Sequence, residues 1–175
     1  MRAWHRLGAA MLGVVALLAL AGCANAEPGV VAYVGDTRIT QGQLDRAMAG
    51  ISSTLQPGQQ VSREAVVDAM IHGALAEQIA VERHIVMTDS EREAVIKTTE
   101  LGGLLAVPDA RPIAFDLADQ QIVAQKLGAE AYLAAVGQRP VTLNPRFGVL
   151  DPTRKVIVDD QTGSLAKPAS PAPTP

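Results

Sequence analysis

The sequence predicts a mainly α-helical domain with a short strand at its start and a strand or hairpin at its end. Aromatic residues make up only 3% of the 175-residue chain, and alanine, valine and leucine dominate its apolar residues. A core of small aliphatic side chains suits packed helices better than an aromatic-rich β-sandwich. Apolar residues at helical spacing and Ser or Thr caps then place four to five helices between the strands.

The first strand and the first helix are marked by composition and by a cap. Residues 30–35, VVAYVG, are β-branched and run into a Gly-Asp turn, which predicts a strand that ends there. Thr40 and Gln43 have the spacing of a capping box, so a helix should begin at Thr40. Its apolar residues recur at helical spacing, which requires one buried face. The segment LQPGQQ, residues 55–60, should end it.

Two more helices follow in the middle of the chain. The serine that opens residues 62–83 can cap a long helix with a wide apolar side. Thr88 and Glu91 form a second capping box, which predicts a helix over 88–101. Two glycines at 102–103 should end that helix, since glycine is the preferred residue beyond a helix C-terminus.

The last third of the chain returns from helix to extended structure. Two prolines within 108–115 indicate a connection, after which Asp116 can cap a helix that runs to about Leu127. Residues 129–137 predict a fifth helix. Residues 139–160 return to extended patterning, with Val141 and Leu143 alternating with polar residues and a β-branched run at 156–158, and they predict a strand or hairpin. We find no internal repeat and expect one domain over 30–160.

One stripe of the long helix is polar. Glu64, Asp68 and His72 recur every four residues, which predicts a solvent-exposed side of that helix. A metal site there would need a second ligand cluster to complete the coordination sphere, and none is evident. The sequence also has no nucleophile elbow, no Cys and His pair, no phosphate-binding loop and no dinucleotide fingerprint. We therefore expect no metal, no cofactor and no enzymatic activity.

Residues 1–22 have the layout of a secretory signal peptide: a basic start, an apolar stretch and small residues before Cys23. The apolar stretch is about 15 residues, shorter than the roughly 20 that span a bilayer. Leu20 to Cys23, LAGC, resembles the bacterial lipobox. The resemblance implies that Cys23 is acylated, becomes the first residue of the mature chain and anchors it to the extracytoplasmic face of the cell membrane. Alternatively, Cys23 is an inert residue beside an ordinary cleavage site.

The mature chain should have a short segment before the folded domain and another after it. Residues 23–29 are a short lipidated tether, and the proline-rich residues 161–175 should be disordered because they cannot bury apolar surface. Removal of Arg2 and Arg6 with the leader takes the formal charge from −3 to −5. Nucleic-acid binding requires clustered positive charge, so we expect no nucleic-acid partner.

Two stretches carry a family resemblance. VVAYVGDTRITQGQLDRAMAGI, residues 30–51, resembles the start of the N-terminal domain of the SurA and PrsA exported foldases. SREAVVDAMIHGALAEQIAVERHIVMTDSERE, residues 62–93, is similar to the long helix and capped helix that follow in that family. VTLNPRFGVLD, residues 141–151, resembles the closing segment of related lipoproteins from high-GC Gram-positive bacteria. Gly35-Asp36 departs from the family's usual Asn-Gly turn. The positions that match the long helix are Met70, Ile71, Leu75, Gln78 and Ala80.

The resemblance implies a chaperone-like lipoprotein that binds unfolded or assembling exported polypeptides. It does not imply the prolyl isomerase activity, which needs a further domain and a histidine pair that we do not find in the sequence. The alternative is an adaptor lipoprotein that docks one specific cell-envelope partner. The apolar residues that would form a client-binding surface, or equally the core between the first two helices, are Met48, Ile51, Met70, Ile71 and Leu75.

Overall fold

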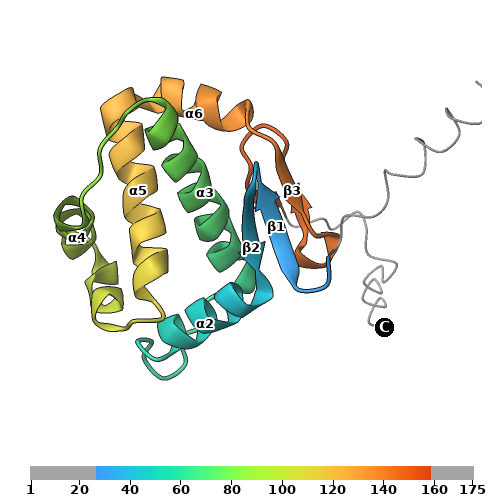
Figure 1. Cartoon of the computed structure of the whole chain (residues 1–175). Helices are drawn as coiled ribbons and strands as arrows, with labels where there is room; N and C mark the ends of the chain where they lie inside the picture. Colours follow the sequence, from blue (N-terminus) through green and yellow to red (C-terminus); the bar gives the residue numbers. More distant parts are fainter. Residues whose placement is uncertain (1–26, 159–175) are drawn as a thin grey trace, which may run out of the picture.

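The computed structural model describes residues 27–158, which are mainly helical with a few short antiparallel strands (Figure 1). This confirms the mainly helical fold class. Cys23, the predicted leader and the predicted tail lie outside the described residues. No helix among those described is both long and apolar enough to cross a bilayer. The α-helices are α2 (Gln41–Ser52), α3 (Arg63–Glu82), α4 (Asp89–Lys97), α5 (Arg111–Leu127) and α6 (Ala129–Gly137).

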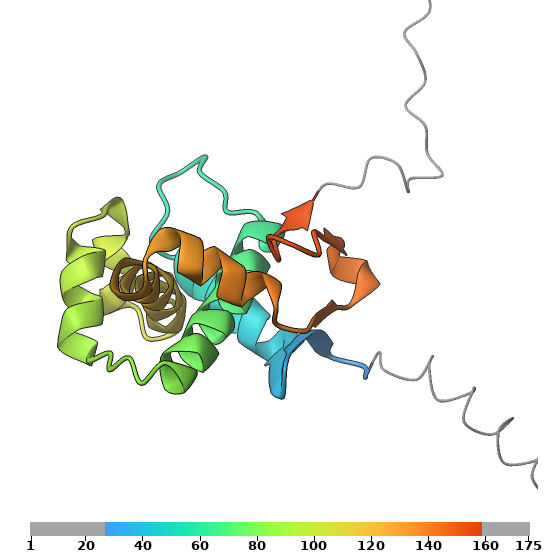
Figure 2. The same cartoon turned by 90° about the horizontal axis from the view of Figure 1, so that it is seen from above.

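The elements lie in successive layers. The strands, α3, α5 and α4 follow one another across the molecule, so α4 and the strands occupy opposite ends (Figure 1). The most extensive contact is between α3 and α5, and α4 packs on the far side of α5. Helix α2 lies along one edge, and α6 crosses the opposite edge from the end of α5 toward the strands (Figure 2).

The predicted N-terminal strand is the centre of a small sheet. Gly35, with a φ of +53°, forms the turn after this strand, and glycine adopts this left-handed conformation without a steric penalty. The Gln78 side chain on α3 donates from Nε2 to the carbonyl oxygen of Val34 at 2.7 Å, which fixes the sheet on the helix. The order of the antiparallel strands is β2 (Thr37–Thr40), β1 (Val30–Val34) and β3 (Val141–Leu143).

Three helix starts were predicted correctly from their caps. Thr40 and Gln43 form the expected capping box: the Thr40 hydroxyl accepts from the Gln43 amide at 3.3 Å, and Gln43 Oε1 accepts from the Thr40 amide at 2.7 Å. Ser62 caps α3 and Thr88 caps α4, each by accepting from a backbone amide three residues on. These signals are local, so they do not depend on the rest of the fold.

The predicted end of the third helix was wrong. Helix α4 ends before Thr98, and Gly102 and Gly103 lie inside a 3₁₀ helix, η2 (Glu100–Ala106), which the sequence did not suggest. The hydroxyls of Thr98 and Thr99 donate back to carbonyl oxygens in the last turn of α4. The Thr99 hydroxyl also accepts from an amide of η2, so the chain ends one helix and caps the next at the same residue.

The predicted start of the fourth helix was also wrong. Helix α5 begins at Arg111, with Pro112 in its first turn, and Asp116 lies inside it. Proline fits the first turn because it needs no intrahelical amide bond there and its φ is already helical. No side chain caps this start. Asp116 instead faces α3 at Gly73, where an added Cβ would overlap the aspartate side chain.

The chain after α6 closes over the sheet and α3. The Asn144 side chain donates from Nδ2 to the carbonyl oxygen of Val30 at 3.0 Å, which pins the end of β3 to the start of β1. Phe147 is partly buried against the core. The elements that follow β3 are η3 (Pro145–Phe147) and an antiparallel pair of very short strands, β4 (Val149–Leu150) and β5 (Ile157–Val158).

A single core joins the sheet to the helices. Its largest fully buried side chains are aliphatic, as the aromatic-poor composition suggested. Gly50 lets α2 approach the start of α5, since a Cβ there would lie 2.6 Å from the amide nitrogen of Ala110. The fully buried leucines and isoleucines are Leu44, Ile71, Leu75, Ile79, Ile96 and Ile122.

Candidate functional site

The candidate site is a groove bounded by α4, η2, α5 and α6. Its volume is about 500 Å³, and its lining is mostly apolar. Concave, mainly apolar sites with a few polar groups are the usual form of a binding site. We refer to it as the apolar groove; its lining residues are Ile96, Thr99, Leu101, Leu117, Gln120, Gln121, Ala124, Ala129, Tyr132 and Leu133.

The floor of the apolar groove is one face of α5. Leu117, Gln121 and Ala124 are spaced four and three residues apart, so they lie above one another on the helix surface. Ala114 and Ala118 lie on a different face and are fully buried in the core. Helix α5 therefore uses one side for the core against α3 and another for the groove.

The walls come from the segments on either side of α5. Gly128, at a φ of +90°, separates α5 from α6 and allows the chain to turn so that Leu133 reaches the groove. Leu101 of η2 forms part of the other wall. Leu133 is 60% exposed and Leu101 39% exposed, and both line the same hollow. Exposed apolar side chains that gather at one hollow commonly mark an interaction site.

Tyr132 contributes a buried ring to the same groove. Only 4% of the residue is exposed, and its hydroxyl has no hydrogen-bond partner among the described residues. Burial raises the pKa of Tyr132 to about 12, because ionisation would place a charge in apolar surroundings. The hydroxyl is therefore neutral at physiological pH, and the groove carries no charge from this residue.

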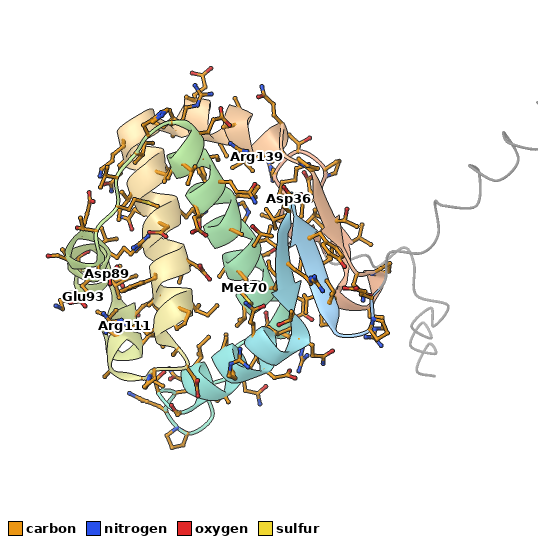
Figure 3. The ribbon with its side chains drawn as sticks, in the orientation of Figure 1. Asp36, Met70, Asp89, Glu93, Arg111 and Arg139 are labelled. Carbon is orange, nitrogen blue, oxygen red and sulfur yellow. The ribbon has the colours of Figure 1, made fainter. Side chains whose placement is uncertain are left out.

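The α4 wall is held to α5 chiefly by charged groups. Arg92 donates to both carboxylate oxygens of Asp119, at 2.6 and 3.1 Å, and to Asp89 at 3.0 Å. The ring of Phe115 lies against two guanidinium groups. The Cζ atom of Arg92 is 5.5 Å from the ring centroid, and the Cζ atom of Arg111 is 5.0 Å from it. Figure 3 shows Asp89 and Arg111 at this junction of α4 and α5.

Two further carboxylates of α4 are paired in the same way. Glu93 accepts from Arg111 at 2.7 Å and from Lys97 at 3.1 Å. Lys126 reaches Glu91 at 2.7 Å, and this hydrogen bond lowers the pKa of the Glu91 carboxyl. The only residue of α4 that is buried is Ile96. Several ion pairs, together with the buried Ile96, therefore position this wall of the groove.

Comparison with known proteins gives no match for this chain. It matches no family model, no curated protein and no solved structure. The resemblance of residues 30–97 to the SurA and PrsA foldases stays a prediction. The function of the apolar groove is accordingly argued from its own residues.

The predicted client-binding residues lie elsewhere in the fold. Ile71 and Leu75 are fully buried, and Ile51 is 7% exposed, so these three belong to the core. Met48 and Met70 are partly buried and pack against that core, with Met70 on α3 (Figure 3). None of the five lines the apolar groove. These residues of α2 and α3 therefore belong to the core or pack against it, which is the alternative that the sequence left open.

The predicted exposed stripe on α3 was wrong at His72. The residue is only 8% exposed, because the chain around β5 covers this part of the helix. Asp68 accepts from the Ile157 amide at 2.7 Å, which fixes that cover. Burial lowers the pKa of the His72 imidazole, while the Asp68 carboxylate and the Lys155 backbone act in the opposite direction. No group of metal-ligating side chains occurs in the described part of the chain.

A partly buried titratable group, Asp116, lies between α3 and α5. Burial raises the pKa of Asp116 to about 7, and the nearby carboxylates of Asp119 and Glu77 act in the same direction. Arg92 opposes them, but its guanidinium is already engaged by Asp119. Asp116 does not line the apolar groove, so its effect falls on the packing of the two central helices.

Proposed function

We propose that this chain is an extracytoplasmic lipoprotein, anchored through Cys23, whose SurA-like helical domain binds apolar segments of unfolded or assembling exported proteins. The observation that carries the proposal is the apolar groove with its two exposed leucines, Leu101 and Leu133. A groove of this size accepts a few apolar side chains at a time. Binding would be weak for each segment and would depend on composition more than on one defined sequence.

The position of the groove fits an anchored binder. Strand β1 begins a few residues after Cys23, and the intervening residues 24–29 reach at most roughly 20 Å. The strands and α4 lie at opposite ends of the domain (Figure 1). An anchor at Cys23 would hold the strand end toward the bilayer and leave the α4 end, with the groove, turned away from it.

The order of the first elements supports the SurA-like assignment. A short strand, a tight turn and a Thr-capped helix occur in the expected order over residues 30–52, although a second strand, β2, which was not expected, lies between the turn and the helix. A second capped helix of the expected length follows as α3. The support for the family proposal therefore comes from the order of the elements along the chain.

Suppression of aggregation tests the binding function. A soluble chain beginning at Ala24 should reduce light scattering by an unfolded client protein at near-stoichiometric ratio. Replacing both Leu101 and Leu133 with glutamate should abolish this effect, because charged groups in the groove would need to be desolvated on binding. Replacing Val81 and Val86 with glutamate makes the matched control: both valines are 74% exposed, they do not line the groove, and the charge change is equal.

Three outcomes separate the alternatives. Loss of protection in the leucine variant alone supports client binding at the groove. No protection by the unmodified chain would count against the chaperone function. Capture of a single dominant envelope protein, lost in the leucine variant, would instead favour the adaptor function.

The anchor has its own test. Mass spectrometry of the mature N-terminus should show an acyl modification on Cys23, and Cys23→Ala should release the protein from the membrane fraction. Retention of the variant in that fraction would contradict the lipid anchor without bearing on the groove.

A further inference from the structure

We propose that the apolar groove selects segments in which apolar side chains are flanked by lysine or arginine. The proposal rests on the proposed function and adds the charge of the ligand. It depends on Glu100 and Glu130, two exposed carboxylates that adjoin the groove lining from opposite sides. Glu100 lies between Thr99 and Leu101, and Glu130 directly follows Ala129.

These two carboxylates differ from the others near α4. Glu91 is paired with Lys126, and Glu93 with Lys97 and Arg111. By contrast, neither Glu100 nor Glu130 takes part in an ion pair with another described residue. Two exposed carboxylates without an ion pair among the described residues are therefore sequence neighbours of the groove lining, one in η2 and one in α6.

The position of Glu100 and Glu130 within their helices leaves both carboxylates free to interact with a ligand. Each lies in the first turn of its helix, Glu100 in η2 and Glu130 in α6, where a carboxylate interacts favourably with the helix N-terminus. Such an interaction is compatible with exposure to solvent, and both residues remain exposed. A basic side chain beside a bound apolar segment would meet one or both carboxylates, and an acidic side chain would be repelled.

The test compares three peptides that share one apolar core and differ only in flanking lysine, serine or glutamate residues. Affinity for the mature protein, purified from cells that export it, is measured by fluorescence anisotropy at low salt. We expect the lysine peptide to bind about three- to tenfold more tightly than the serine peptide, which is the range for two exposed ion pairs. The tighter binding of the lysine peptide should largely disappear near 1 M salt, where the Debye screening length is about 3 Å.

Variants locate the effect. Exchanging both Glu100 and Glu130 for glutamine should remove the preference for lysine, so that the lysine and serine peptides bind with similar affinity. Glu64→Gln, which neutralises an exposed carboxylate on α3 outside the groove, should leave the preference intact. Equal binding of all three peptides would overturn the charge selection while the proposed function stands. If no peptide binds, the proposed function fails and this inference fails with it.

Discussion

Asp116 offers the sharpest test of the packing between the two central helices. Its side chain lies against Gly73 of α3, and burial with Asp119 and Glu77 raises its pKa to about 7. Arg92 opposes this rise only in part, because its guanidinium is engaged by Asp119. Asp116→Asn keeps the shape of the side chain and removes its ability to ionise. The variant therefore isolates the cost of that charge.

The sign and size follow from linkage. The folded pKa is about 7 against an ordinary value of 3.8, so the folded protein keeps a proton that the unfolded chain has lost. Stability from this group is fully present below about pH 4 and is lost as pH rises toward and through about 7. About three pH units separate the two pKa values, which corresponds to about 4 kcal/mol. Asp116→Asn should be more stable than the unmodified protein by about this amount at pH 8, and nearly equal to it at pH 4.

The assay is urea denaturation of both proteins at pH 4, 6 and 8, followed by circular dichroism. The free energy of unfolding of the variant relative to the unmodified protein should rise steadily across this range. A constant difference at all three pH values would refute the reasoning, because it would show that the carboxyl titrates alike in the folded and unfolded states.

Three further predictions concern stability in the same assay. Arg92→Ala should cost about 3 kcal/mol or more because it leaves a buried carboxylate unpaired, whereas Arg63→Ala, which breaks an exposed pair, should cost less than about 1 kcal/mol. The contribution of His72 to stability should fall as pH drops below about 6.5, because folded His72 resists a proton that the unfolded chain accepts, and it opposes the larger contribution of Asp116; His72→Leu should lack this part of the pH dependence. Gly50→Ala should cost about 1–3 kcal/mol, since the new Cβ would press on the Ala110 backbone; a neutral result would contradict the close approach.

Three helix starts were predictable, whereas the start of α5 and the end of α4 were not, for a physical reason. A cap such as Thr40 or Ser62 acts on amides within three residues, so the sequence alone shows it. Asp116 has the residue type of a cap, but the chain had already begun its helix at Arg111. The glycine pair at 102–103 was likewise absorbed into a 3₁₀ helix. A residue type that favours a helix boundary is therefore not sufficient, because competing local hydrogen bonds decide whether the boundary forms there.

The site was less predictable than the fold because it is built from separate elements. Ile71 and Leu75 stand out in the sequence as strongly apolar, yet such residues are the first to be buried. Leu101 and Leu133 look like ordinary core positions at the end of one predicted helix and within another. Their exposure depends on how η2 and α6 are placed around α5. His72 shows the converse, since a polar stripe became buried once the chain near β5 crossed it.

The way α4 is attached connects the fold to the proposed function. Most of the apolar core lies between the strands, α3 and α5, while α4 contributes a single buried residue and several ion pairs. Segments with few buried apolar contacts are those that open locally at the lowest free energy. The stable part of the protein thus supplies the groove floor, and the more weakly held part supplies a wall. That division suits a site that must accept apolar segments of differing shape, because the wall can adjust while the core stays intact.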